Sequence, residues 1–231
     1  MRAQKRIATL DLLRSLAIVL MVIFHFIYDL KFFGYYETTI PDEQPWRAFR
    51  YLILTLFISC VGAGMVLAHK GQLNTRKFLL RLGQIAAGAA IISVTSLVMF
   101  PEQWIHFGVL HFIAVATLLT IPVLNSPQLA AAMGAGVIAA YNVGWLSHWW
   151  PFQYYANLIP AYSVDFVPLF PWIGVAWLGV ALGHSQWLQS DPLAAIHHAK
   201  TYALPGRHSL IIYLVHQPLL FTLLWVAGLP L

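Results

Sequence analysis

Residues 1–31 read MRAQKRIATLDLLRSLAIVLMVIFHFIYDLK, and this stretch decides how the chain is expected to fold. Most of it is apolar and long enough for an α-helix that crosses a bilayer, which needs about 20 residues. It nevertheless contains four ionisable side chains, Asp11, Arg14, His25 and Asp29. Because an α-helix turns about 100° per residue, all four lie within roughly 60° on one stripe. Charge inside a bilayer is costly, so this stripe is expected to face a protein interior or a wet cavity and to mark a functional site.

Composition extends this conclusion to the whole chain. Of its 231 residues, 60% are hydrophobic and only 9% are charged, which is typical of a polytopic membrane protein and not of a soluble domain. The longest stretch without Asp, Glu, Lys or Arg is 103–164, which is long enough for two spans. The net charge of +5 does not indicate nucleic-acid binding, because the basic residues lie in short loops between apolar segments.

The hydropathy pattern predicts an all-α fold, a bundle of about seven transmembrane helices in a single domain, 1–231. Short connections rich in proline separate the apolar segments. Clusters of small residues in 83–90 and 130–140 suit helix packing within one chain or in a homo-oligomer. The seven expected spans are 7–30, 48–68, 77–100, 107–124, 128–146, 166–184 and 207–228.

The basic residues predict the orientation of these spans, because cytoplasmic loops are enriched in Lys and Arg. An inside N-terminus and an outside C-terminus place nine basic residues on or near the cytoplasmic side: Arg2, Lys5, Arg6, Lys70, Arg76, Lys77, Arg81, Lys200 and Arg207. Three lie near the other face: Lys31, Arg47 and Arg50.

His25 is the first candidate for chemistry. Asp29 follows it at the i,i+4 spacing, at which two helical side chains can meet. A carboxylate that accepts the imidazole proton would fix the tautomer and make the other nitrogen more basic, as a general base requires. The alternative is a structural hydrogen bond between helices.

Arg14 keeps its charge at any accessible pH and therefore needs an anionic partner. Asp11, one turn earlier, could neutralise it without any further role. In the functional interpretation, Arg14 anchors a phosphate-bearing or thioester-bearing ligand that enters from the cytoplasm.

The last expected span contains a second polar face, within an arc of about 100°: Ser209, Tyr213, His216 and Gln217. Such a face can simply hold helices together, but an ionisable residue near mid-bilayer favours function. Two further histidines precede or begin the fourth span. His106 is expected to be structural, whereas His111 lies deeper and could approach His25.

Four segments together resemble a known family: RIATLDLLRSLAIVLMVIFHFIYDL, FGVLHFIA, VDFVPLFPWIGVAWLGVALG and GRHSLIIYLVHQPLL. This set is similar to the bacterial branch of the heparan-α-glucosaminide N-acetyltransferase catalytic-domain family, within the transmembrane acyltransferase superfamily. The Arg14-to-His25 spacing also resembles that of the membrane acyltransferase-3 proteins. The resemblance implies a multi-pass protein of the bacterial inner membrane. It would transfer an acyl group from cytoplasmic acyl-CoA, usually acetyl-CoA, to a carbohydrate, lipid-linked or other hydroxyl or amine acceptor at the outer face.

The sequence departs from that family at one point. Lysosomal relatives place an active-site histidine in the lumenal loop after the first span, whereas residues 26–68 here contain no histidine. That role must pass to His25 or His111, or be absent.

On this interpretation acyl-CoA enters the bundle from the cytoplasm, and no metal is expected. The residues expected to hold it are Arg14, Arg207, Tyr213, His216 and Gln217. His25, oriented by Asp29, would be the general base on the acceptor. His111 or Tyr213 would stabilise the oxyanion that forms on the thioester carbonyl.

Two other classes remain open. A transporter or flippase would also have a polar stripe through a helix bundle, although no internal repeat supports it. A b-haem electron carrier would use the membrane histidines as iron ligands. Against the haem protein, the sequence does not suggest paired histidines at similar depth on two helices.

Overall fold

The computed structural model describes residues 6–69 and 73–227, and every regular element in these ranges is a helix. The predicted all-α class is therefore confirmed for this part of the chain. Arg2, Lys5 and Lys70, which contributed to the orientation argument, lie outside it. The chain divides into two compact units, Met1–Phe57 with Ser190–Leu231, and Ile58–Gln189. Each is described by itself.

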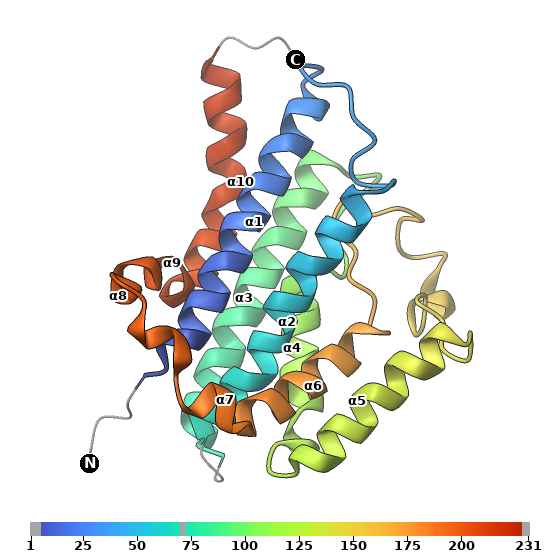
Figure 1. Ribbon diagram of the computed structural model, residues 1–231. Coiled ribbons are helices and arrows are strands. Elements are labelled where there is room, and N and C mark those ends of the chain that lie inside the picture. The colour runs from blue at the N-terminus through green and yellow to red at the C-terminus, as the bar shows by residue number, and fades with distance from the viewer. Residues whose placement is uncertain (1–5, 70–72, 228–231) are drawn as a thin grey trace. The chain divides into compact units, whose positions relative to one another are not determined.

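The first unit is built around two long helices that lie side by side, α1 (Ala8–Phe32) and α10 (Ser209–Val226) (Figure 1). Near the start of α1, Asp11 contacts Arg207, and near its end Asp29 contacts Gln217. Residue numbers therefore rise in the same direction along both helices, which makes them parallel. The unit also contains the first half of α2 (Trp46–His69), η3 (Pro192–Ala195), α8 (Ala199–Tyr202) and α9 (Leu204–Arg207).

The start of α1 is capped from the distant end of the sequence. The Asp191 carboxylate accepts hydrogen bonds from the backbone N–H of Ala8 at 3.1 Å and of Thr9 at 2.7 Å. The Thr9 hydroxyl also donates to it, at 2.8 Å, and accepts from the backbone N–H of Leu193. A carboxylate suits the positive end of the helix dipole and satisfies N–H groups that have no partner within the helix. The cap fastens the segment before α10 to the start of α1.

The backbone of α9 packs directly on α1 through Gly206. Its N–H donates to the Ser15 hydroxyl at 2.8 Å, and a Cβ at this position would overlap the backbone carbonyl oxygen of Asp11. Only glycine allows this approach. The contact places the next residue, Arg207, beside the first turns of α1.

The described residues of the second unit contain five complete helices and two 3₁₀ turns: α3 (Thr75–Met99), α4 (Val109–Leu119), η1 (Ile121–Val123), α5 (Pro127–Asn142), η2 (Phe152–Tyr155), α6 (Trp172–His184) and α7 (Gln186–Gln189). Within it, α5 packs on α6 where a Cβ on Gly134 would meet the carbonyl of Gly174. A Cβ on Gly179 of α6 would likewise overlap the backbone carbonyl oxygen of Ser59 on α2. Small residues thus allow the helices to approach closely, as is common in membrane bundles.

In residues 6–69 and 73–227, four helices are long and apolar enough to cross a membrane: α1, α2, α3 and α10. Each of the seven predicted segments contains a helix, but three of these helices are shorter than a span. The α4 helix has 11 residues, or about 17 Å, against a hydrocarbon core of about 30 Å. Proline accounts for part of the difference, because Pro122 follows α4 and Pro171 precedes α6. Seven crossings therefore remain a prediction.

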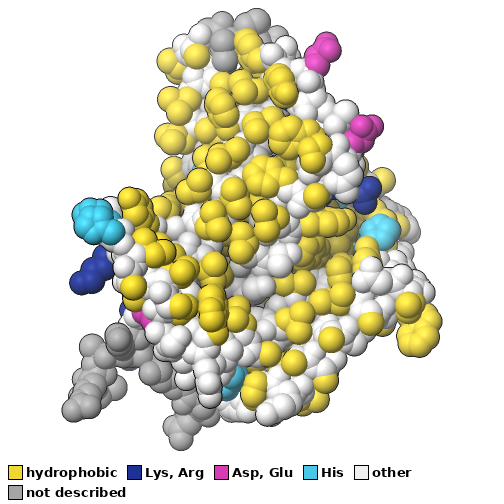
Figure 2. Space-filling model, in the orientation of Figure 1, with side chains coloured by type: hydrophobic (Ala, Val, Ile, Leu, Met, Phe, Trp, Pro, Cys, Tyr) yellow, Lys and Arg dark blue, Asp and Glu magenta, His cyan; other side chains and the backbone are white. Residues whose placement is uncertain are grey.

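The outer surfaces of the two parallel helices are apolar (Figure 2). On α1 the exposed large side chains include Leu16, Val19 and Ile23, and on α10 they include Ile211 and Val215. These residues recur at the three- and four-residue intervals of one helical face. Such a surface suits contact with lipid, so the polar stripe of α1 lies on a different side of the helix.

Gly206→Ala tests the contact between α9 and α1. The added methyl group has no space against the Asp11 backbone, so we expect the variant to lose about 1–3 kcal/mol of stability. Thermal unfolding in detergent measures this as a lower midpoint. Gly136→Ala in α5 is the control, because a Cβ there meets nothing within 4 Å. It should be neutral or slightly stabilising, and equal midpoints for both variants would contradict the packing described.

Candidate active site

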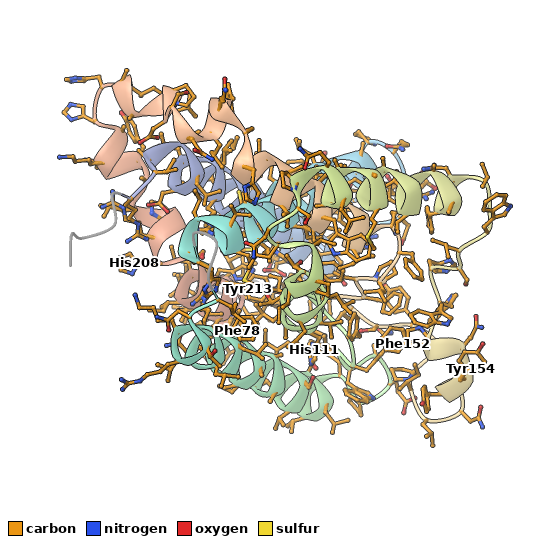
Figure 3. The ribbon with its side chains drawn as sticks, turned by 90° about the horizontal axis from the view of Figure 1, so that it is seen from below. Phe78, His111, Phe152, Tyr154, His208 and Tyr213 are labelled. Carbon is orange, nitrogen blue, oxygen red and sulfur yellow. The ribbon has the colours of Figure 1, made fainter. Side chains whose placement is uncertain are left out.

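The first unit contains two polar clusters along α1, one near each end of the helix. His25 follows Arg14 by 11 residues, which corresponds to about 16 Å along the axis. Both clusters receive residues from α10 or from the turn that precedes it. Figure 3 labels Tyr213 and His208 in this part of the chain and His111 in the second unit.

Asp11 is the centre of the first cluster, where three guanidinium groups surround one carboxylate. Arg6 Nε lies 2.7 Å from Asp11 Oδ2, Arg207 Nε lies 3.4 Å from the same oxygen, and Arg14 Nη1 lies 3.6 Å from Oδ1. The Asp11 side chain is buried, whereas Arg14 and Arg207 are each exposed over roughly a quarter of their side chains. The cluster therefore has a formal net charge of +2. Asp11 does pair with Arg14, as the sequence suggested, but it cannot neutralise all three cations.

His25 and His216 form the centre of the second cluster. His216 Nε2 lies 3.2 Å from His25 Nδ1, and the ring centroids are 4.8 Å apart. His216 is buried and His25 is half-buried. Apolar residues of α1 and α2 pack around this region, among them Met21, Phe24 and Ile53.

The surrounding carbonyl groups determine where the protons of this pair lie. His216 Nδ1 is 2.7 Å from the Tyr213 carbonyl oxygen and must donate, because a carbonyl only accepts. His25 Nδ1 is 3.0 Å from the Met21 carbonyl oxygen and must donate for the same reason. The proton on His25 Nδ1 is therefore shared with the lone pair of His216 Nε2. In this neutral pair the lone pair of His25 is on Nε2, which is the form that a general base requires.

Asp29 does not pair with His25, which corrects the interaction expected from their i,i+4 spacing. Asp29 is fully buried, and its Oδ1 accepts a 2.7 Å hydrogen bond from Gln217 Nε2 on α10. The physical reason is that each group has another partner: Gln217 occupies Asp29 Oδ1, and His25 Nδ1 lies against the Met21 carbonyl oxygen and His216 Nε2. The His25 ring accordingly reaches Met21, one turn earlier. Asp29 remains in the cluster, but it does not orient the His25 ring directly.

The predicted oxyanion donor His111 lies in the second unit, where both of its ring nitrogens have partners. Its Nδ1 accepts from the backbone N–H of Gly108 at 3.2 Å, so Nε2 carries the proton and donates to Ser93 Oγ at 3.0 Å. The Ser93 hydroxyl in turn donates to the Ile105 carbonyl oxygen at 2.6 Å. These hydrogen bonds join α3, the segment 100–108 and the start of α4.

His106 lies among aromatic rings of the second unit, against Trp104, Phe152 and Phe166. Both of its nitrogens are buried without a hydrogen-bond partner in the part of the chain that the structure describes. Burial disfavours the charged ring and lowers the pKa of His106 below its usual value. His106 is therefore part of an aromatic cluster, in keeping with the structural role expected from the sequence.

The structure also corrects the sequence argument against a haem protein. The sequence did not suggest paired histidines on two helices, yet His25 on α1 and His216 on α10 are such a pair. Their facing nitrogens are 3.2 Å apart and share a proton. Two imidazoles that ligate one ion from opposite sides would stand about 4 Å apart, at roughly 2 Å per bond. Among residues 6–69 and 73–227, no group of three potential metal ligands is found.

The structure thus brings seven of the eight predicted site residues into one unit: Arg14, Arg207, Tyr213, His25, His216, Asp29 and Gln217. Sequence reasoning missed Arg6 as a partner of Asp11. It also missed the role of Asp191 as the cap of α1. A basic residue five positions before a buried aspartate was the available signal for Arg6. For Asp191 there was none, because its partners Ala8 and Thr9 are more than 180 residues away.

Comparison with known families identifies the family of the chain. The family model described as heparan-alpha-glucosaminide N-acetyltransferase, catalytic, matches residues 6–218, which include both polar clusters. No curated protein and no solved structure matches the chain. The chain belongs to the heparan-alpha-glucosaminide N-acetyltransferase catalytic family, a family of membrane acetyltransferases.

Proposed function

We propose that the protein transfers an acyl group, usually acetyl, from cytoplasmic acyl-CoA to a hydroxyl or amine acceptor at the outer face of the bacterial inner membrane. The observation that carries this proposal is the arrangement of the α1–α10 pair. An anion-attracting cluster and a histidine pair lie on the same two helices, about 16 Å apart along α1. Acyl-CoA has matching parts, since a long pantetheine arm separates its phosphates from the thioester.

The donor is proposed to bind first through its phosphates. Arg14 and Arg207 are partly exposed, and the net charge of +2 around Asp11 leaves them able to attract an anion. Arginine suits phosphate because its planar group donates two parallel hydrogen bonds. The pantetheine arm would then follow the α1–α10 contact toward Tyr213 and the histidines.

The reaction is proposed to take place at His25. Its Nε2 removes the proton of the acceptor while the acceptor oxygen or nitrogen bonds to the thioester carbonyl carbon. The C–S bond then breaks, and the imidazolium returns the proton to the sulfur of CoA. His216, hydrogen-bonded to His25 Nδ1, stabilises the positive charge that forms in between. The Tyr213 hydroxyl, from the turn of α10 before His216, is the proposed oxyanion donor.

The parallel direction of α1 and α10 supports the topology that this mechanism needs. If only α1, α2, α3 and α10 crossed the membrane, the first and last helices would be antiparallel. An odd total number of crossings makes them parallel, and seven is the number that the hydropathy pattern predicts. The chain ends would then lie on opposite sides, with the Asp11 cluster toward the cytoplasm and Asp29 toward the outer face.

His25→Ala tests the chemical step. We expect acetyl transfer from acetyl-CoA to a sugar acceptor to fall by about 10²- to 10⁴-fold in kcat, the range that general-base catalysis contributes. His216→Gln should lower kcat less, because His25 keeps its lone pair. His197→Ala is the control, since His197 is exposed and outside both clusters. Full turnover by a folded His25→Ala protein would remove His25 from the mechanism.

Arg207→Gln tests the donor site. Loss of one cation from the Asp11 cluster should raise the KM for acetyl-CoA about tenfold with little change in kcat, in line with one charged hydrogen bond. The difference from wild type should shrink in high salt, which screens partly exposed charges. Arg76→Gln, at an exposed position in the first turn of α3, is the matched control. The same KM in both variants would show that Arg207 does not contact the donor.

A further inference from the structure

Two buried oxygen atoms beside the histidine pair lack hydrogen-bond partners in the described structure. They are Asp29 Oδ2 and Gln217 Oε1. The Asp29 side chain is fully buried, and its other oxygen is already occupied by Gln217 Nε2 at 2.7 Å. That bond also fixes the Gln217 amide, so its unpartnered atom is the carbonyl oxygen, which can only accept.

Unpaired acceptors in the interior are costly, and native proteins usually satisfy them. Here two occur on neighbouring side chains in an otherwise well-bonded contact between α1 and α10. Neither an additional carboxylate nor a carbonyl could satisfy them. The partner that fits is a group with O–H or N–H bonds, and most readily a ligand with two such groups.

The position of the two oxygens relates them to the proposed reaction. Asp29 is one turn beyond His25 on α1, a rise of about 6 Å, and Gln217 directly follows His216 on α10. One acceptor molecule could therefore donate a hydrogen bond to Asp29 and Gln217 through one hydroxyl. Its neighbouring hydroxyl or amine would then face the histidine pair. One turn further along each helix, Phe33 and Phe221 are in contact with ring centroids 5.4 Å apart. Aromatic rings at this position suit the apolar face of a ring-shaped polyol.

We infer that Asp29 and Gln217 form the acceptor subsite and select acceptors that have a second hydroxyl next to the group that is acylated. This inference rests on the proposed function for the identity of the reacting group. It assigns Asp29 to substrate recognition, in place of the role in orienting His25 that the sequence suggested. A mono-functional alcohol would leave at least one of the two oxygens unpaired and would bind less tightly.

Asp29→Asn is the variant that separates recognition from structure. The new amide keeps one oxygen for Gln217 Nε2 and presents an N–H group in place of the acceptor Oδ2. The amide has nearly the same shape as the carboxylate and carries no charge, so the unfolding midpoint should be unchanged or higher. Gln217→Met, which removes Oε1 at similar volume, is the second variant. Asp42→Asn, in an exposed position of the loop after α1, is the control.

The probes are glucose and its 2-deoxy, 3-deoxy, 4-deoxy and 6-deoxy analogues, with binding to the full-length protein measured by calorimetry without acyl-CoA. We expect wild type and Asp42→Asn to bind at least one deoxy analogue about tenfold more weakly than glucose. In Asp29→Asn and Gln217→Met that difference should disappear, with binding reduced to that of the weaker analogue.

Two results would overturn the inference. One is wild-type protein that does not distinguish glucose from any analogue. The other is a preference that persists in folded Asp29→Asn or Gln217→Met protein. Acetyl transfer, assayed separately, distinguishes this failure from failure of the proposed function. Selective sugar binding without acetyl transfer would contradict the proposed function but support the acceptor subsite. Acetyl transfer without selective binding would support the proposed function but contradict the subsite.

Discussion

The contact between the parallel helices α1 and α10 is the constraint on which the rest of the first unit depends. Charged and polar side chains on a membrane helix are tolerated only where they meet partners, because lipid offers none. Every such group on the stripe of α1 has its described partner on α10, on the turn before it, or on α1 itself. The exposed sides of the same helices are apolar. The polar contact thus fixes which face of α1 is turned inward.

The ends of this contact differ in a way that suits two substrates. Near the start of α1 one buried carboxylate holds three arginines together, and the excess positive charge attracts an anion. Farther along, the histidine pair contacts two backbone carbonyl oxygens, which accept the protons on the two Nδ1 atoms. Beyond it, Asp29 and Gln217 retain unpaired acceptors. Cations, a histidine pair and hydrogen-bond acceptors therefore follow one another along α1 and its neighbours.

The sequence was sufficient for the class of fold and for the stripe, because both depend on local periodicity. The wheel positions of Asp11, Arg14, His25 and Asp29 correctly predicted that they share one inward face. The sequence alone could not identify the partners of these four side chains. A helical wheel does not show that His25 meets His216 rather than Asp29, since that depends on side-chain direction and on a helix some 190 residues away. Helix lengths were overestimated where prolines end α4 and delay α6, and hydropathy alone does not register these breaks.

The central claim is that one polar contact serves reactants from opposite sides of the membrane. Right-side-out and inverted membrane vesicles that contain the protein test it most directly, with acetyl-CoA enclosed and a membrane-impermeant sugar outside, or the reverse. In right-side-out vesicles, the account predicts acetylated sugar outside when acetyl-CoA is enclosed. In inverted vesicles, it predicts acetylated sugar inside when acetyl-CoA is outside and the sugar is enclosed. Product that forms only when both reactants are on one side would contradict it, as would passage of the unmodified sugar without acetyl-CoA.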